Sequence, residues 1–383
     1  MSAEPETIQG ELETVTVSTD RPQGVVRRPR AIVKLNNVAV DGWLEWTVSN
    51  NTYAEADTLR LVYSASALPK ANNARWISEQ TKLFVEILVG FLADDSDILD
   101  PSQASTVIYG RVDSLELDPH ERIITLTGRD LTGSLIDTPC REEFVNQHSS
   151  DIANRLAFSH ELSPVVTDTS TFVGQIYDGG RTVLRGSGSE WDLLNSLARQ
   201  EGFVCYVTDQ RLYFGPDITG SLNPYEITWA PPTDTNGSPR SNAMQISFDR
   251  NTSISGGAQV TVRSVNRRKG RTYQFVYPPT VGPDALQYLF TRPADTEPSA
   301  LEQYAKAVYA TLVSHEMKLN ARLPGDNVLS ISTPIRVSGT DTAFDQIYYP
   351  RLIERAMSME YGYEMSVSAQ NHSPNLMPAS QEE

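Results

Sequence analysis

Few side chains in this sequence stand in patterns that carry out catalysis. The five histidines are His120, His148, His160, His315 and His372. They form no H-x-H or H-E-x-x-H pair and no cluster with cysteine, which are the arrangements that bind zinc. No G-x-S-x-G motif presents a serine nucleophile. Cys140 and Cys205 are too few and too far apart for a disulfide framework, and we expect two buried thiols. The residues therefore predict no enzyme, no metal site and no cofactor.

Two weaker features could bind a ligand. Gly186-Ser187-Gly188-Ser189 precedes a predicted helix, as phosphate-binding turns do. It lacks the Lys-Ser/Thr of a P-loop, and Trp191 stands where a dinucleotide motif has its third glycine. We interpret it as a turn followed by a helix cap. The acidic pairs Asp94-Asp95 and Glu142-Glu143 have the residue types of glycosidase carboxylates, but composition favours a solvated surface for them.

A basic run gives the sharpest charge contrast in an otherwise acidic chain. The chain has 32 Lys and Arg against 48 Asp and Glu, a net charge of −16. This balance argues against a protein that wraps nucleic acid or lies on an anionic membrane. The run consists of Arg267, Arg268, Lys269 and Arg271. It is either a hairpin tip kept soluble by its charge or a contact with an acidic partner, which could be another copy of the chain.

The hydrophobic pattern predicts two strand-rich regions around a helical segment. With 383 residues the chain has room for two or three domains. The acidic start lacks the order of a signal peptide, and the most apolar stretch, 83–92, is too short to span a bilayer. We therefore expect folding in a cytoplasm and no membrane insertion. The predicted divisions are a flexible acidic arm at 1–28, a first β domain at 29–138, a small α/β insertion at 139–220, a second β domain at 221–371 and a flexible tail at 372–383.

Three helices are predicted from apolar spacing and capping residues. The first begins after Ser150, and the second runs from Glu190 to Gln200 between a Ser189 cap and Gly202. The third, at 300–319, has a capping box and an apolar stripe at helical spacing, namely Leu301, Tyr304, Ala305, Val308 and Leu312. Such a stripe should pack on a β domain.

The order of several motifs carries a family resemblance over residues 30–371. The motifs are Gly110-Arg111-Val112-Asp113-Ser114-Leu115, Gly128-Arg129-Asp130-Leu131-Thr132, the helix and hairpin from Ser189 to Phe214, Leu323-Pro324-Gly325, and Leu352-Ile353-Glu354-Arg355. In this order they resemble phage tail baseplate hub proteins of the late control gene D family, which is related to the head of type VI secretion spike proteins. The sequence shows no needle segment of the kind fused to those spikes, and the acidic arm has no counterpart in the family.

The resemblance implies a structural, non-enzymatic baseplate hub. Its expected fold is mainly β with an α+β insertion, in the form of two tail-tube-like β-barrel domains and a small α/β segment. Three copies would form a ring that joins the six-fold tail tube to a separate three-fold central spike. The implied partners are the chain itself as a homotrimer, the tail tube protein, the spike protein and other baseplate proteins. The implied location is the virion baseplate, after synthesis and assembly in the cytoplasm of a bacterial host.

Two further expectations follow. A hub lines the path of DNA or effectors, and a conduit for a polyanion should lack free cations, so we expect neutral to acidic lumen strands and no stable nucleic-acid binding. The alternative is a tail protein that binds cell wall or glycan or degrades peptidoglycan, with segment 145–215 as the recognition element.

Overall fold

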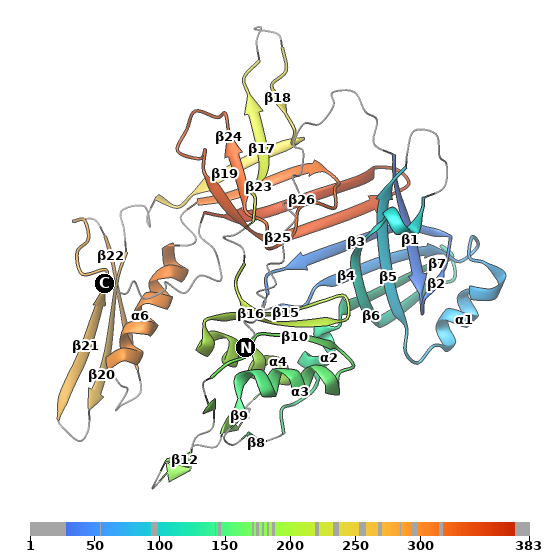
Figure 1. The fold of residues 1–383 in the computed structure, drawn as a ribbon. Helices are drawn as coiled ribbons and strands as arrows, with labels where there is room; N and C mark the ends of the chain where they lie inside the picture. The colour runs from blue at the N-terminus through green and yellow to red at the C-terminus, as the bar shows by residue number, and fades with distance from the viewer. Residues whose placement is uncertain are drawn as a thin grey trace, which may run out of the picture.

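The computed structural model describes residues 28–371 except 54, 93–98, 142, 145–146, 171, 174–175, 178–179, 182–183, 186–187, 219–221, 233–236, 253–257, 267–269, 284, 293–297 and 314–316. The described chain is mainly β, as expected, and its longer helices lie in two places, while the short helix at 74–79 lies apart from them (Figure 1). The predicted arm and tail, at 1–28 and 372–383, lie outside the described residues apart from Arg28.

The first strand-rich region forms an antiparallel sheet in the order β3–β4–β7–β6–β5–β1–β2. β3 shows why the sheet forms, because Trp46 and Val48 are buried while the residues between them point outward. The elements are β1 (Pro29–Leu35), β2 (Val38–Ala39), β3 (Trp43–Asn51), β4 (Thr58–Ser64), η1 (Lys70–Asn72), α1 (Ala74–Glu79), β5 (Phe84–Phe91), η2 (Pro101–Gln103), β6 (Ser105–Asp118) and β7 (Ile123–Asp130).

The second strand-rich region continues the same sheet. β25 pairs with β3, and the order beyond it is β26–β23–β19, while β24, β17 and β18 branch from the start of β25. The strands are β17 (Tyr225–Ala230), β18 (Arg240–Ser241), β19 (Gln245–Arg250), β23 (Met317–Pro324), β24 (Ile335–Ser338), β25 (Ile347–Ser358) and β26 (Gly362–Gln370). β3 pairs with β4 on one edge, and its other edge pairs with β25 of the second region and not with a strand that would close the first region, so the described strands form open sheets. The expected closed barrels are absent from this part of the chain.

The insertion is a compact α/β unit with its own core. Helices α3 and α4 cover one face of a sheet ordered β10–β16–β15 (Figure 1). Ser189 caps α4 and Gly202, with φ 71°, ends it, as the capping pattern predicted. The elements are α2 (Thr132–Asp137), β8 (Glu143–Phe144), β9 (Gln147–His148), α3 (Ser149–Ser159), β10 (Ser163–Val166), β11 (Phe172–Val173), β12 (Ile176–Tyr177), β13 (Gly180–Arg181), β14 (Leu184–Arg185), α4 (Glu190–Glu201), β15 (Phe203–Thr208) and β16 (Arg211–Pro216).

A third body, which we call the outer module, consists of β20 (Ala258–Asn266), β21 (Arg271–Tyr277), β22 (Leu286–Thr291) and α6 (Pro298–Val313). The apolar stripe of α6 packs on this three-stranded sheet. The helix is therefore shorter than the predicted 300–319, and the residues from Met317 onward belong to β23. Strand alternation explains the difference, because Met317, Leu319 and Ala321 are buried at a period of two.

The packing of α6 predicts how two substitutions will rank. Leu301 is 1% exposed in the core of the outer module, whereas Leu312 is half-buried near the helix end. Leu301→Asp should destabilise the module by about 4 kcal/mol, since it buries an unpaired charge. Leu312→Asp should cost less. Hydrogen exchange of the β20–β22 amides measures both, and equal protection in the two variants would contradict this packing.

Candidate functional site

One face of the long sheet is polar and rich in hydroxyl groups. Every second side chain on both sides of the β3–β25 pair points away from the cores. The register places these side chains in cross-strand rows. One row contains Ser366, Glu354, Ser49 and Thr58, and the next contains Thr47, Arg60, Thr127 and Ser114. The row ends on a hydroxyl pair, since Ser114 Oγ lies 2.7 Å from Thr127 Oγ1.

Two arginines on this polar face are paired with carboxylates. Arg60 binds Glu45, and Arg322 donates from Nε to Glu364 Oε2 at 3.0 Å. Exposed ion pairs of this kind add little to stability, but they leave fewer free cations on the surface. Glu354 is exposed in the middle of the face. The described rows therefore carry many hydroxyl groups, and Arg60 and Arg322 are balanced by carboxylates, while the row through Thr58 continues to Arg129 and the exposed Arg111.

A buried guanidinium holds the two halves of the sheet together. Arg355 of β25 is 6% exposed and donates to the Asp326 carbonyl at 3.1 Å and to Asn50 Oδ1 at 2.8 Å. It also donates to the Leu329 carbonyl. Asn50 lies in β3, so one side chain binds a strand of the first region and a loop of the second. Five donors in a planar fork suit arginine to this position.

The loop bound by Arg355 makes a second link to the first region. Tyr363 donates its hydroxyl to Asn327 Oδ1 at 2.9 Å, and Asn327 Nδ2 donates to the Val89 carbonyl in β5 at 2.7 Å. Gly325 is required here, because a Cβ would stand 2.4 Å from the Tyr363 ring. The close approach of backbone and ring explains the glycine in the Leu-Pro-Gly motif.

Two carboxyl groups meet beside this junction. Asp57 accepts from Asn50 Nδ2 and from the Asn51 amide, both at 2.7 Å. Asp130, 8% exposed, accepts from the Thr132 hydroxyl at 2.9 Å, and its amide donates to the Asp57 carbonyl. Burial raises the pKa of Asp57 to about 6. Burial and the nearby Asp57 charge raise the pKa of Asp130 well above its usual range.

The carboxyl pair lines a cavity where three parts of the chain meet. The cavity has a volume of about 210 Å³ and is bordered by the end of β3, by β15 of the insertion and by residues 330–332. Tyr53 and Tyr206, both in its lining, stack on each other with ring centroids 4.8 Å apart. The insertion is therefore joined to both strand-rich regions at the place where the carboxyl pair is buried.

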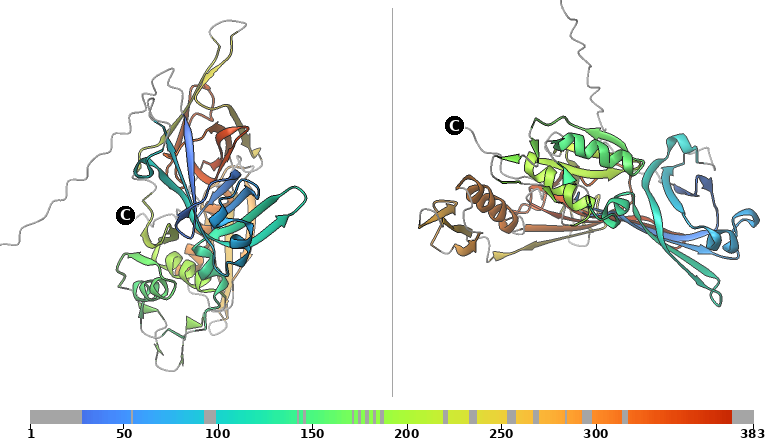
Figure 2. Two further views of the ribbon diagram at one scale, coloured as in Figure 1. Left: turned by 90° about the vertical axis from the view of Figure 1, so that its right-hand side faces the viewer. Right: turned by 90° about the horizontal axis from the view of Figure 1, so that it is seen from below.

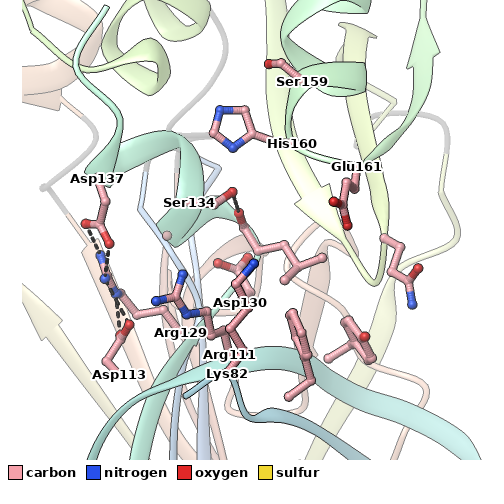
Figure 3. Close-up of a pocket in the computed structure, with 15 residues that line it drawn as sticks. Lys82, Arg111, Asp113, Arg129, Asp130, Ser134, Asp137, Ser159, His160 and Glu161 are labelled. Carbon is pink, nitrogen blue, oxygen red and sulfur yellow. Dashed lines mark hydrogen bonds and ion pairs between the residues drawn. The ribbon is translucent and has the colours of Figure 1, made fainter. Parts of the chain in front are cut away.

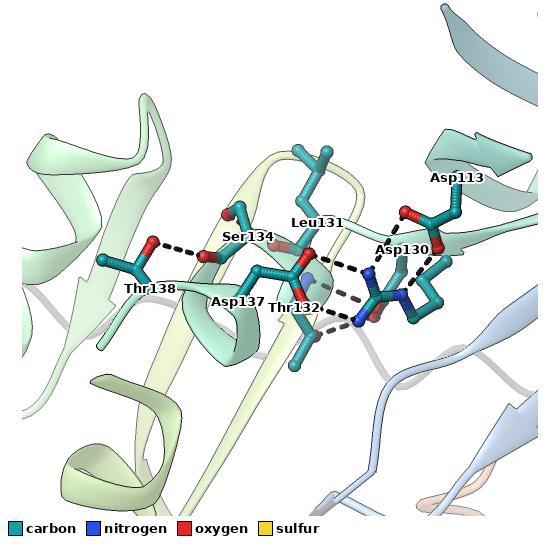
Figure 4. A network of polar contacts seen from close by, with 8 residues as sticks. Asp113, Asp130, Leu131, Thr132, Ser134, Asp137 and Thr138 are labelled. Atoms are coloured by element: carbon teal, nitrogen blue, oxygen red, sulfur yellow. Dashed lines mark hydrogen bonds and ion pairs between the residues drawn. The ribbon is translucent and has the colours of Figure 1, made fainter. Parts of the chain in front are cut away.

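A larger cleft of about 300 Å³ lies between the first region and the insertion (Figure 3). One of its lining residues is Arg129, which binds Asp113 at 2.6 Å and Asp137 at 2.8 Å (Figure 4). This arginine lowers the pKa of Asp137. Across the cleft, His160 Nε2 lies 2.6 Å from Glu190 Oε2. The triad of Arg129, Asp113 and Asp137 joins α2 to the sheet and keeps Asp137 ionised. Asp137 is therefore not suited to act as a general acid.

The residues that the sequence analysis singled out do not come together in one site among the described residues. Arg267, Arg268 and Lys269 lie outside the described residues, while Arg271 opens β21 and is exposed. Cys140 and Cys205 are both buried thiols, as expected, and are not joined in a disulfide; burial raises the pKa of Cys205. Among the described residues no three or more His, Cys, Asp or Glu side chains are grouped to hold a metal. The helices of this part of the chain include none that is both long and apolar enough to cross a membrane.

Sequence reasoning did not single out the junction residues. Asp130 and Arg355 fall inside the motifs that carry the family resemblance, but no spacing rule marked these two residues or Asp57. One signal was present for Arg355, because it stands between Ile353 and Met357 at a period of two, where an inward-facing side chain is expected. A charge at such a position needs buried partners.

Comparisons with known proteins identify the fold. No protein-family model matches the sequence. No curated protein matches it either. Among solved structures, a tail protein from Neisseria meningitidis MC58 is similar at a TM-score of 0.65 and 15% identity, covering 91% of this chain and 99% of that one. A 43 kDa tail protein of prophage MuSo2 from Shewanella oneidensis has the same TM-score and coverages at 14% identity.

A third similar structure is prophage tail protein gp18 from Listeria monocytogenes, with a TM-score of 0.52 and 10% identity, covering 89% of this chain and 94% of that one. The chain therefore has the fold of phage and prophage tail proteins over nearly its whole described length. This confirms the mainly β, tail-protein fold that the order of motifs implied, although the described strands form no closed barrel.

The buried carboxyl pair predicts an unusual pH dependence. Because the folded pKa of Asp57 is raised to about 6, the folded chain binds a proton that the unfolded chain has lost, and stability falls as pH rises through that range. Between about pH 7.5 and about pH 5 the free energy of unfolding should rise by about 1 kcal/mol. Thermal melting measures this, with Asp57→Asn as the comparison. An equal pH dependence in both proteins would assign the effect elsewhere.

Proposed function

We propose that this chain is a structural hub of a phage or phage-like tail baseplate, in which three copies form a ring around a conduit. The observation that carries the proposal is the β3–β25 pairing. It sets β3–β4–β7–β6 and β25–β26–β23–β19 side by side in one antiparallel sheet. Each chain thus offers two neighbouring halves of one sheet, and three chains offer six. That number suits a body between a six-fold tube and a three-fold spike.

The polar face of the sheet supports a conduit role. DNA is retained by surfaces whose Lys and Arg replace its counterions, so a passage for DNA should present neutral or acidic groups. The rows on this face carry hydroxyls, and Arg60 and Arg322 are each bound to a carboxylate. We assign this face to the lumen and the buried cores to the outer side of the ring.

The remaining assignments follow the same proposal. Residues 29–138 and 221–371 supply the tube-like domains, and 139–220 is an insertion on the outside. The partners are the tail tube protein, a separate spike protein and other baseplate proteins, and the site of action is the virion baseplate after assembly in the bacterial cytoplasm. The role is structural, not enzymatic. A zymogram on peptidoglycan tests the alternative of a wall-degrading tail protein.

Assembly is the first test. The purified chain should form a homotrimer, either alone or when mixed with its cognate tube and spike proteins, because the sheet ends at β19 with an edge that has one partner among the described strands. Light scattering gives the mass, and negative-stain images show whether a ring forms. A chain that stays monomeric both alone and with its tube and spike proteins would contradict the hub proposal.

The lumen assignment makes a second, separable prediction. The assembled wild type should not retain duplex DNA at low ionic strength. Thr47→Lys with Thr127→Lys adds two cations to the polar face of each copy and should create salt-sensitive retention. Ser78→Lys with Ser163→Lys adds the same charge at exposed sites in α1 and β10 and serves as the control. Equal retention by both variants would mean that the polar face is not the conduit.

A further inference from the structure

The β6–β7 hairpin extends beyond the body as an acidic segment, residues 112–123. We call it the hairpin arm, and it is distinct from the predicted N-terminal arm at 1–28. β5 pairs with β6 only as far as Arg111, so the edge from Val112 to Asp118 has β7 on one side and no strand on the other within the described chain. This edge exposes Leu115 by 37% and Leu117 by 47%. The acids of the arm are Asp113, Glu116, Asp118 and Glu121, against the single cation Arg122. An open, partly apolar edge of this kind invites pairing with another chain.

The outer module has the complementary character. Its sheet turns Val260 and Val262 toward α6, so the alternate residues Arg263 and Val265 point from the opposite face. On that face Leu289 is 59% and Val265 is 50% exposed. Arg263, Arg271 and Arg292 are exposed cations of the same module. Both β21 and β22 pair only with β20 in this part of the structure, which leaves two open edges.

The charge of the module contrasts with that of the whole chain. Residues 258–313 contain seven Lys and Arg and four Asp and Glu, a net charge of 7 − 4 = +3 in a chain of −16. Glu302, the one acid among the module's described residues, is bound to Lys306 at 2.8 Å. The exposed arginines are therefore not neutralised by carboxylates of the described module. Arg263 donates to Gln274 and Arg292 lies over the Tyr304 ring, both neutral groups.

The arm and the module lie at opposite ends of the molecule (Figure 2). In the view from below, the module is at one side and the long β6–β7 hairpin projects from the other. Two complementary surfaces so placed cannot meet within one chain. They can meet between copies, where the tail of one molecule contacts the head of the next. A repeated contact of this type closes into a ring when the rotation permits.

We propose that the hairpin arm (residues 112–123) of one copy docks on the β20–β22 sheet of a second copy. The contact pairs the open β6 edge and its two leucines with the exposed apolar side chains of the module, and it places Glu116 and Glu121 near the module's arginines. Opposite charges of this kind set the register and speed the encounter, while the apolar groups supply contact area. This contact deepens the proposed hub function and rests on it for the closure of the ring.

Charge reversal with rescue tests the contact in the full-length chain. The arm variant is Glu116→Lys with Glu121→Lys, and the module variant is Arg263→Glu with Arg271→Glu. Each should weaken self-association at least about tenfold at low ionic strength. A chain that carries all four substitutions should associate again, because the charges are again opposite. Asp168→Lys with Glu360→Lys makes the same change in net charge as the arm variant, at exposed sites elsewhere, and should associate like the wild type.

Sedimentation at several salt concentrations measures the association, and thermal melting checks that each variant folds. Failure of the four-fold variant to associate, or association of the arm variant at wild-type strength, would overturn the arm contact. If trimers form regardless of these charges, the hub proposal survives and only the contact is wrong. If the wild-type chain stays monomeric alone but its arm variant loses binding to another tail protein, the second copy is the wrong occupant and the proposal fails.

Discussion

The arrangement depends on one buried cation. Arg355 is removed from water inside a β-sheet core, and such a charge persists only where hydrogen bonds satisfy it. Its guanidinium binds the Asn50 side chain in β3 and two backbone carbonyls of the loop after β23. Asn50 in turn binds Asp57, so the hydrogen bonds continue to the carboxyl pair at the insertion. The two halves of the sheet and the α/β insertion thus meet around one polar network, while each keeps an apolar core of its own.

This arrangement, with a polar network at the junction and apolar cores within the parts, explains the contrast between the two sides of the sheet. Most apolar side chains lie in the cores, and the outward face between them carries Ser, Thr and charged side chains, two of which, Arg60 and Arg322, are paired with carboxylates. A sheet with one solvated face is ordinary for antiparallel strands. What is specific here is the length of the face, because the β3–β25 ladder carries it across both strand-rich regions without a break. The proposed conduit is a consequence of that ladder.

Much of the fold could be predicted from the sequence, and the rest depended on long-range pairing. The strands of the first region, α4 with its Ser189 and Gly202 caps, and the stripe of α6 all follow from local periodicity and capping. The β3–β25 pairing could not be predicted, since no local pattern records which edge meets which. The same reason explains the separate outer module and the partly buried Asp57. The polar sites were missed because burial, and not residue spacing, defines them.

The central ladder also sets a condition on synthesis. The hydrogen bond between Asn50 and Arg355 joins residues 305 positions apart. At roughly 5–20 residues per second, a ribosome needs about 15–60 seconds between the two. During that interval β3 is a long strand with one edge exposed, the kind of edge that recruits other chains into aggregates. The β3 edge of the first region therefore stays unpaired until β25 has been synthesised. Any truncation before β25 would leave that edge permanently unpaired.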